Sequence, residues 1–419
     1  MPPENATANL GTRAKNAASG SAPSRCPAPT QGASGAAVPS YDACALLMAA
    51  PFASPSKPSR PIVPQRTAPH APRLPRRPPS CHNGDRRAAH TIAPGSHLRS
   101  GAASAGKGQT MLHEITFPSS NERDQVTGWI YVPACEPEGI VQLVHGFGEH
   151  SRRYFHMIVA LMDAGFIVAA DDHVGHGATA IANSTWGDWG DTGPHTMMED
   201  EKRFMDIVAE KYPDLPYFMF GHSMGSMIAR DFSAKYGSEL AGAIYCGTTG
   251  IFKNTHEVRA KLDAAIEAGG AHDSDPAFVN ELMGWMFARC DEGAKLGNEW
   301  ICHDPYVQRD HAADPFDAFT HPTHNISLRD FIDMMLCIEG EDWARKVPAD
   351  LPVLLIAGDQ DPVGNYGEGV YQVANWLADT GHAHVVTKLY SGYRHEIHNY
   401  DDLKDDVEDT LISWLYLNL

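Results

Sequence analysis

Hydrophobic and polar residues follow two alternating patterns from residue 111 to the end of the chain. Residues 140–144 (IVQLV) and 166–170 (FIVAA) are short apolar runs, typical of strands that are buried on both faces. Between them, apolar residues recur at helical spacing over residues 153–164, which predicts an amphipathic helix. The same reasoning predicts strands at 217–220, 241–245, 353–357 and 384–390 and helices at 198–212, 224–236 and 401–417.

A hairpin is expected ahead of these elements, because apolar and polar residues alternate over 113–117 and 127–132 and residues 121–124 supply a turn. Strands that alternate with helices form a mostly parallel sheet with helices on both faces, so the predicted fold class is α/β. Residues 250–348 interrupt this alternation with mainly helical segments. We interpret this stretch as a helical cap inserted over the carboxyl edge of the sheet.

The predicted domains are therefore a core formed by residues 111–249 and 349–419, the cap at 250–348, and a leader at 1–110. The leader holds 17 of the 30 prolines and almost no aromatic residues. It lacks the apolar surface that would offset the entropy of ordering a chain, so we expect it to be disordered. A basic transit segment, and translated upstream sequence with Met111 as the working start, are alternative interpretations.

Charge divides the chain in the same way. The formal net charge is −19, but 13 of the 33 basic and only 3 of the 52 acidic residues precede Met111, so the leader carries about +10 and the remainder about −29. A surface this acidic repels nucleic-acid phosphates and anionic bilayers, so we expect no nucleic-acid partner. A neutral or cationic small-molecule ligand fits better.

Cysteine spacing and hydropathy indicate where the protein works. The eight cysteines lack the close pairs of metal or redox motifs, which favours free thiols in a reducing compartment. No apolar run approaches the roughly 18 residues needed to cross a bilayer. The sequence thus predicts a cytoplasmic protein without an integral membrane segment, and it does not indicate an oligomeric state.

The first sign of chemistry is a G-x-S-x-G pattern at residues 221–225, between an apolar strand and a helix. In this context the serine occupies a strained turn, and close packing leaves no room for side chains at Gly221 and Gly225. The hydroxyl of Ser223 would lie beside the helix N-terminus, where free N–H groups favour developing negative charge. Ser223 is therefore the candidate nucleophile.

A serine nucleophile needs a histidine base and a carboxylate that orients it. Two carboxylates, Asp359 and Asp361, follow the strand at 353–357, and His395 follows the strand that ends at Tyr390. The order serine, aspartate, histidine is the order of α/β-hydrolases. Of the 22 histidines, His395 has this position, whereas His398 is expected to be a packing residue.

The attacked carbonyl becomes an oxyanion, which needs two fixed donors. The backbone N–H of Met224 is one candidate. Phe147 N–H is the second, because the flanking glycines of His145-Gly146-Phe147-Gly148 allow a sharp turn after the strand at 140–144. His145 could be mistaken for a base, but its position suits a structural hydrogen bond beneath this loop.

Five segments together resemble the monoacylglycerol lipase and lysophospholipase group of α/β-hydrolases, and they span most of the chain from residue 112 onward. They are LVHGFGEHSRRY at 143–154, DDHVGHG at 171–177, GHSMG at 221–225, GDQDPV at 358–363 and GYRHE at 392–396. The resemblance implies the α/β-hydrolase fold, with residues 250–348 as the lid. One departure is Ser226, where relatives usually have another glycine.

The resemblance also implies the role of each residue. Ser223 matches the nucleophile, His395 the base, and Phe147 and Met224 the oxyanion donors. The acid of the family falls at the second aspartate of its loop, which favours Asp361 over Asp359.

We therefore predict a serine hydrolase that cleaves carboxylic monoesters of the monoacylglycerol or lysophospholipid type through an acyl-enzyme. No cofactor is expected. No metal is expected either, because the cap histidines, including His321 and His324, lack a supporting ligand spacing. An amidase or aminopeptidase on the same scaffold is the alternative enzyme, and a non-catalytic receptor is disfavoured because no catalytic element is missing.

Apolar stripes in the cap are candidates for an acyl-binding pocket, although core packing explains most such stripes. Methionine suits such a pocket because it fills irregular gaps. The residues in these stripes are Phe278, Leu282, Met283, Trp285, Met286, Phe287, Phe331, Met334, Met335 and Leu336.

Overall fold

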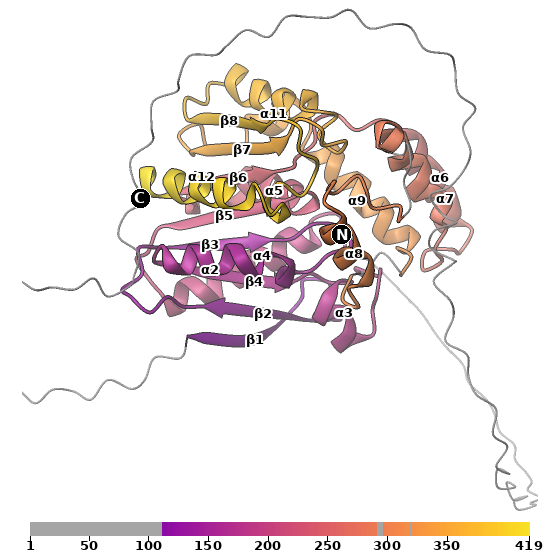
Figure 1. The fold of residues 1–419 in the computed structure, drawn as a ribbon. Coiled ribbons are helices and arrows are strands. Elements are labelled where there is room, and N and C mark those ends of the chain that lie inside the picture. The colour runs from indigo at the N-terminus through magenta and orange to yellow at the C-terminus, as the bar shows by residue number, and fades with distance from the viewer. Residues whose placement is uncertain (1–110, 291–295, 318–320) are drawn as a thin grey trace, which may run out of the picture. The chain divides into compact units, whose positions relative to one another are not determined.

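The computed structural model describes residues 111–290, 296–317 and 321–419, so the expectations for the leader lie outside the described residues. The described residues form an eight-stranded sheet with the order β1-β2-β4-β3-β5-β6-β7-β8 (Figure 1). Its strands are β1 (Leu112–Pro118), β2 (Gln125–Tyr131), β3 (Gly139–Val144), β4 (Phe166–Asp172), β5 (Tyr217–His222), β6 (Gly242–Cys246), β7 (Val353–Gly358) and β8 (Val385–Tyr390).

The six neighbouring strands β4, β3, β5, β6, β7 and β8 are parallel, whereas the first two strands make antiparallel pairs. β1 pairs antiparallel with β2, and β2 pairs antiparallel with β4. Every residue of β3, β4, β5, β6 and β7 is buried, as the continuous apolar runs predict for strands covered on both faces. The predicted hairpin and the predicted α/β class are both confirmed.

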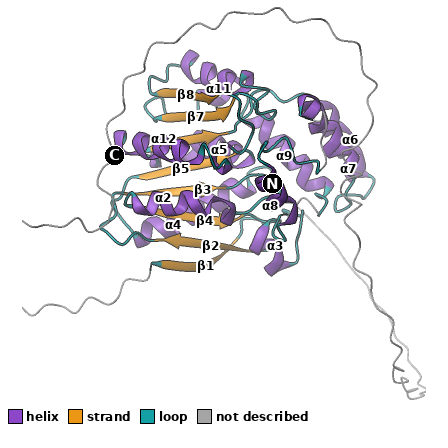
Figure 2. Ribbon diagram, in the orientation of Figure 1, coloured by secondary structure: helices purple, strands orange, loops and turns teal. Residues whose placement is uncertain are grey.

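Helices cover both faces of this sheet (Figure 2). On one face, the rings of Tyr154 and Trp414 contact Phe220 and Phe218 of β5. On the other face, Tyr245 of β6 donates a hydrogen bond of 2.8 Å to Ser233. The helices of the core are α2 (Phe155–Asp163), α3 (Gly177–Asn183), α4 (Thr196–Lys211), α5 (Met224–Tyr236), α11 (Glu368–Asp379) and α12 (Lys404–Leu417), with short 3₁₀ turns η1 (Ser151–Tyr154), η2 (Gly237–Glu239) and η5 (Ile397–Asn399).

Two of these helices, α3 and α11, were not predicted. In α11 the signal was present, because Val370, Val373 and Leu377 are buried at helical spacing. α3 is short and rich in alanine, and its apolar stripe is too small to stand out from a loop. The N-terminal part of the helix predicted over 153–164 instead forms the 3₁₀ turn η1, so α2 begins at Phe155.

The segment between β6 and β7 is helical, as expected, and lies at one end of the sheet in Figure 1. α9 packs against α5, and Phe331 of α9 contacts Phe147 in the loop after β3. These contacts lie at the carboxyl ends of the strands, where the candidate site is expected. The helices of this segment are α6 (Thr255–Glu267), α7 (Pro276–Met283), α8 (Pro305–Ala313), α9 (Asn325–Cys337) and α10 (Gly340–Ala344), with the 3₁₀ turn η3 (Gly284–Arg289).

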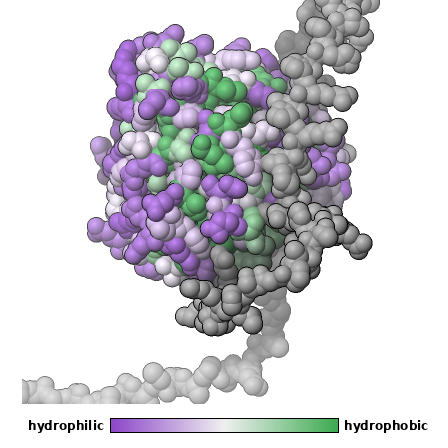
Figure 3. Space-filling model, turned by 90° about the vertical axis from the view of Figure 1, so that its left-hand side faces the viewer, coloured by the Kyte–Doolittle hydropathy of each residue, from purple (hydrophilic) through white to green (hydrophobic). Residues whose placement is uncertain are grey.

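Three properties of the described residues can be compared with the sequence: membrane-spanning helices, free cysteines and surface hydropathy. Among the described residues, no helix combines the length and apolar character needed to span a bilayer. Cys246, Cys290, Cys302 and Cys337 are free thiols. On the face that carries the C-terminus, hydrophilic side chains border a central group of apolar ones (Figure 3).

Candidate active site

Ser223 occupies a strained turn between β5 and α5. Its φ of 56° and ψ of −121° place a non-glycine residue in a region that side chains disfavour, which persists only when the surroundings hold it. A Cβ atom added to Gly221 would lie 2.2 Å from the carbonyl oxygen of Gly225, and one added to Gly225 would lie 2.1 Å from that of Val144. The two glycines are therefore required by close backbone packing, as the motif predicts.

His395 and Asp361 form a buried pair on neighbouring loops. Asp361 follows β7 and His395 follows β8, and these strands are paired in parallel. The Nδ1 atom of His395 lies 2.9 Å from both carboxylate oxygens of Asp361. Asp361 is 0% exposed and His395 2% exposed. The Nε2 atom of His395 is also buried and has no hydrogen-bond partner among the described residues.

The end of β6 brings this pair next to Ser223. The backbone N–H of Ser223 donates a 2.9 Å hydrogen bond to the carbonyl oxygen of Cys246. A Cβ atom on the next residue, Gly247, would lie 3.1 Å from Cε1 of His395 and 3.4 Å from Oδ2 of Asp361. The three residues expected from the order serine, aspartate, histidine thus converge on one point at the sheet edge.

Asp359 has a different role from Asp361. Its carboxylate accepts hydrogen bonds from Ser391 Oγ at 2.8 Å and from Gly392 N–H at 2.7 Å. Burial opposes ionisation here, but these bonds outweigh it and lower the pKa of the Asp359 carboxyl. Asp359 therefore anchors the loop that carries His395, and the geometry favours Asp361 as the partner of the imidazole.

The loop after β3 lies against Ser223. A Cβ atom on Gly146 would lie 2.9 Å from Cβ of Ser223, which leaves room only for glycine. The N–H of Gly146 donates to Glu149 Oε1 at 2.6 Å, and the ring of Phe147 packs 5.7 Å from that of Phe331. The backbone of Phe147 is thus held beside Ser223, the candidate nucleophile. Met224, the other candidate oxyanion donor, directly follows Ser223 in the chain.

The two rival histidines are structural. His145 is buried, its Nδ1 lies 2.9 Å from the Gly146 carbonyl oxygen, and its Nε2 accepts from His173 N–H at 3.0 Å. His398 is buried and stacks on Tyr154 with ring centroids 4.7 Å apart. Burial lowers the pKa of both imidazoles well below the ordinary value, which keeps them neutral.

Sequence reasoning missed a buried charged network beside the candidate triad. Arg153 lies 2.7 Å from Glu396 and 3.5 Å from Glu149, and all three side chains are at least 95% buried. Glu149 also accepts from Tyr154 Oη at 2.6 Å. Burial, the largest single effect, would raise the pKa of Glu396, but Arg153 together with His311, Asn399 and His222 outweighs it and lowers that pKa to about 2. Because Glu396 follows His395 directly, this network holds the backbone of the loop that carries His395 in place.

Trp300 is a second residue that sequence reasoning missed. Its ring lies 5.1 Å from the ring of His395 and 5.1 Å from that of Phe287. Phe287, Phe331 and Met334, which the apolar stripes indicated, are buried, and Phe331 packs on Phe147. Aromatic residues from the segment 250–348 thus cover the histidine.

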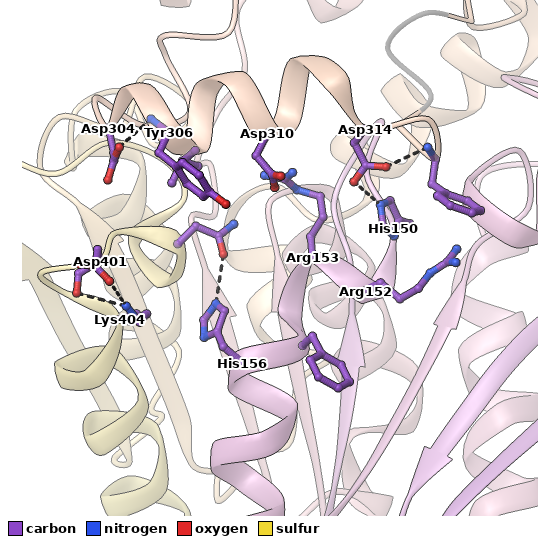
Figure 4. A pocket seen from close by; sticks show the side chains of 14 residues that line it. His150, Arg152, Arg153, His156, Asp304, Tyr306, Asp310, Asp314, Asp401 and Lys404 are labelled. Carbon is purple, nitrogen blue, oxygen red and sulfur yellow. Dashed lines mark hydrogen bonds and ion pairs between the residues drawn. The ribbon is translucent and has the colours of Figure 1, made fainter.

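One pocket among the described residues lies apart from the candidate site. It has a volume of about 680 Å³ and opens between α8 and the segment that contains η1 and α2 (Figure 4). Neither Ser223 nor His395 lines it. The lining residues are His150, Arg152, Arg153, Phe155, His156, Asp304, Tyr306, Val307, Asp310, Asp314, Phe316, Asn399, Asp401 and Lys404.

Comparison with known proteins shows the family to which the chain belongs. A family model described as serine aminopeptidase, S33, matches residues 135–402. The chain belongs to this family. A thermostable carboxyl esterase from Bacillus coagulans, solved in complex with glycerol, is 55% identical, with a TM-score of 0.72 and coverage of 74% of this chain and 99% of the esterase.

Two further relatives are lipases. A structure described as a lipase in its open form is 38% identical, has a TM-score of 0.68, and is matched over 73% of this chain and 99% of its own. The monoacylglycerol lipase of Mycolicibacterium smegmatis is 28% identical over 297 residues, which is 68% of this chain and 92% of that enzyme. The predicted resemblance to the monoacylglycerol lipase group is confirmed, and the protein is an α/β-hydrolase that acts on carboxylic esters.

Proposed function

We propose that the protein is a serine hydrolase of monoacylglycerol-like monoesters, with Ser223 as nucleophile, His395 as base and Asp361 as acid. The observation that carries this proposal is the buried His395–Asp361 pair, whose Nε2 is left without a partner at a strained serine turn. A base must keep one nitrogen free for the serine proton, while the other is held by a carboxylate.

The proposed reaction has two steps. Ser223 Oγ attacks the ester carbonyl while His395 Nε2 takes its proton, and the N–H groups of Phe147 and Met224 stabilise the oxyanion. The imidazolium then gives the proton to the leaving alcohol, which leaves an acyl group on Ser223. Water, deprotonated by the same imidazole, hydrolyses this acyl-enzyme and restores the serine. No cofactor takes part in these steps.

The proposed substrate class rests on the relatives and on the cap. The esterase that is 55% identical was solved with glycerol, and the named relatives include monoacylglycerol lipases. The apolar cap residues near the triad, among them Phe287 and Phe331, suit an acyl chain. We propose that residues 250–348 act as the lid and that the flanking parts form the core. A lysophospholipid is the less favoured monoester, because its phosphate approaches an acidic body.

A second candidate function is an amidase or aminopeptidase activity at the same site. The description of the matching family names a serine aminopeptidase, and a Ser-His-Asp site cleaves both esters and amides. The named relatives with the highest identities are an esterase and a lipase, which favours the ester.

A labelling and turnover experiment tests both candidates. The full chain should react with a fluorophosphonate probe at Ser223, and Ser223→Ala should abolish the labelling. A panel of monoacylglycerols, lysophospholipids, nitrophenyl esters and aminoacyl anilides should then give the highest kcat/KM on a monoacylglycerol. Faster cleavage of an anilide than of every ester supports the aminopeptidase, and absence of labelling contradicts both enzymes.

A further inference from the structure

A group of ligand-type side chains lies at the 680 Å³ pocket, outside the proposed triad. It consists of His150, which precedes η1, and Asp314 and Asp317, which follow α8. His150 and Asp314 line the pocket, and Asp317 lies beside them without being part of its lining. The Nε2 atom of His150 lies 2.9 Å from Asp314 Oδ2 and 4.0 Å from Asp317 Oδ1. Figure 4 shows His150 and Asp314 facing one another at one side of the pocket. The core and the cap segment each contribute to this group.

Asp317 is the unusual member, because its carboxylate is buried without a hydrogen bond. The nearest imidazole nitrogens are His311 Nδ1 at 3.7 Å and His150 Nε2 at 4.0 Å. The Asp317 side chain is 4% exposed, and neither of its oxygens has a hydrogen-bond partner among the described residues. Burying a carboxylate without compensation is costly, and the usual compensations are a paired charge or a bound metal ion. The side chain lies beside His150, which is itself 3% exposed. A buried carboxyl without a hydrogen bond, next to a buried imidazole, is an arrangement that a cation would satisfy.

The local charge balance also favours a cation. Arg153 is the nearby buried cation, but it is already paired with Glu396 at 2.7 Å and Glu149 at 3.5 Å. Its single charge faces these two carboxylates as well as those of Asp314 and Asp317. Burial raises the pKa of the Asp317 carboxyl to about 9, so without a cation this group holds a proton at neutral pH. The remaining three carboxylates already exceed the single guanidinium, and a divalent ion would compensate them and take the place of the Asp317 proton.

The spacing suits a small tetrahedral ion. Zinc binds imidazole nitrogen and carboxylate oxygen at about 2.0–2.2 Å, so two ligand atoms of a tetrahedral site lie about 3.4 Å apart. The donor atoms of His150, Asp314 and Asp317 all lie within 4.8 Å of one another, and the distances from His150 Nε2 to Asp314 and Asp317, 2.9 Å and 4.0 Å, lie on either side of this value of about 3.4 Å. The pocket provides access for the ion and room for a water as a fourth ligand.

We propose that His150, Asp314 and Asp317 form a zinc site that joins the core to the cap segment. Binding would replace the proton that His150 shares with Asp314 and would place the two positive charges of the ion beside the carboxylate of Asp317. The ion would tie the loop after β3, which also carries Phe147, to the end of α8. The site is separate from the proposed hydrolysis and needs no catalytic residue.

Other groups of potential ligands are weaker candidates. Asp188, His272 and His324 lie together, but Arg123 occupies the same Asp188 oxygen at 2.8 Å and repels a cation. Asp171, His173 and Glu201 are fully buried, so an ion would have to enter through packed core. The group at the pocket combines a buried carboxyl that makes no hydrogen bond with access from solvent.

Zinc titration of the chelator-treated full chain tests this proposal. Calorimetry should give one zinc ion per chain, and zinc at about 100 times its Kd should raise Tm by about 3–6 °C. Cobalt should bind with the visible absorption of a tetrahedral N/O site, whereas magnesium should bind more weakly because it prefers octahedral oxygen ligands. Ser223→Ala should bind zinc like the wild type, which separates this result from the proposed hydrolase activity.

Variants decide where the zinc binds. Asp317→Asn keeps the shape and, because the metal-free Asp317 carboxyl is protonated at neutral pH, leaves the charge of the metal-free protein unchanged, so it should fold. It removes a carboxylate ligand and should weaken zinc binding by about 100-fold or more. Asp314→Asn should do the same, whereas Asp310→Asn, on the same pocket wall, should bind like the wild type. Unchanged binding in Asp317→Asn, loss of binding in Asp188→Asn instead, or no binding to the wild type would each overturn the proposal.

Discussion

At the residue scale, the candidate site depends on backbone strain and on one free nitrogen. Ser223 keeps its positive φ because Gly221 and Gly225 pack against backbone atoms at distances that no side chain would allow. Asp361 holds Nδ1 of His395, so the proton-accepting lone pair belongs to Nε2. Both features hold the reactive groups in place before the substrate arrives.

The proposed triad predicts a large loss of activity when the proposed nucleophile or base is removed. Ser223→Ala and His395→Ala should each lower kcat by about 10³–10⁶, because the residues act as a unit. Steady-state hydrolysis of a monoacylglycerol measures this. Ser226→Ala is the matched control, since among the described residues this hydroxyl donates to the Ser223 carbonyl alone, at 2.6 Å. Turnover at the wild-type rate in Ser223→Ala would reject the assignment.

The two aspartates of the loop after β7 should differ in their effect. Asp361→Asn should lower kcat by about 10⁴, because an amide favours the wrong tautomer of His395. Asp359→Asn removes the carboxylate that accepts hydrogen bonds from Ser391 and Gly392. It should lower kcat far less than Asp361→Asn does. The kcat ratio of the two variants measures the difference. The reverse ranking would assign the acid to Asp359.

At the element scale, the loops after the strands are held by charges and aromatic rings from distant segments. Arg153 in η1 pairs with Glu396 beside η5, and Trp300 from the segment 250–348 covers His395. Removing one partner of such a buried pair leaves the other charge uncompensated, which costs about 3–5 kcal/mol. The stability of the site therefore resides largely in these contacts between elements.

Glu396→Gln should reduce the free energy of unfolding by about 3 kcal/mol at pH 7, the lower end of that range, because Glu149 still faces Arg153. The folded-state pKa of Glu396, about 2, lies below the unfolded value of about 4.3. Its contribution is therefore complete above about pH 4.3 and is lost as the pH falls towards 2. Urea unfolding of the wild type and of Glu396→Gln, from pH 7 to pH 2, measures this contribution to the free energy of unfolding.

The exposed pair Arg345–Glu341 is the control for this measurement. Both of its side chains are more than 40% exposed, so Glu341→Gln should cost at most about 1 kcal/mol. The difference in the free energy of unfolding between the wild type and Glu396→Gln should become smaller below about pH 4. A difference that stays constant down to pH 2 would contradict the assigned pairing.

The cap predicts how the rate depends on the acyl chain. Each CH₂ moved from water into an apolar slot contributes up to about 0.8 kcal/mol, or roughly fourfold in kcat/KM. The kcat/KM of nitrophenyl monoesters should rise from acetyl to medium chains and then level off. Phe331→Ala should flatten this rise, whereas Tyr306→Ala, 70% exposed on α8, should not. A series that peaks at acetyl would reject the slot.

At the scale of the whole molecule, sheet order and charge decide what reaches the site. The parallel strands β3, β5, β7 and β8 end at one edge and bring their loops together. The net charge of about −29 over residues 111–419 makes the approach of an anionic head group unfavourable, and salt reduces this effect. A neutral monoacylglycerol should therefore be preferred over an anionic lipid.

The composition of residues 1–110 predicts that they add nothing to the folded core. Their deletion should change Tm by less than about 2 °C and leave kcat/KM on a monoester unchanged, because such a segment has little apolar surface to bury. Thermal unfolding and steady-state kinetics of both chains, at equal concentration and salt, measure this. A large drop in Tm on truncation would show that the segment packs on the body.

The sequence by itself determined the strands, the fold class and the candidate triad. Buried strands are continuous apolar runs, and the serine turn is a local pattern of strand, glycine and helix, so neighbours along the chain carry both signals. The order of Ser223, Asp361 and His395 then followed from where their strands end. α11 shows the limit, because its buried stripe at 370, 373 and 377 was present but was not recognised.

Only the tertiary structure decided which distant residues meet. Glu396 pairs with Arg153 across 243 positions, and His150 meets Asp314 across 164. Because the sequence showed no ligand spacing among the cap histidines, it gave no sign that a core histidine would face cap carboxylates. Such contacts depend on how the loops and the cap pack on the finished sheet, and that packing is a property of the whole chain, which no local pattern of residues encodes.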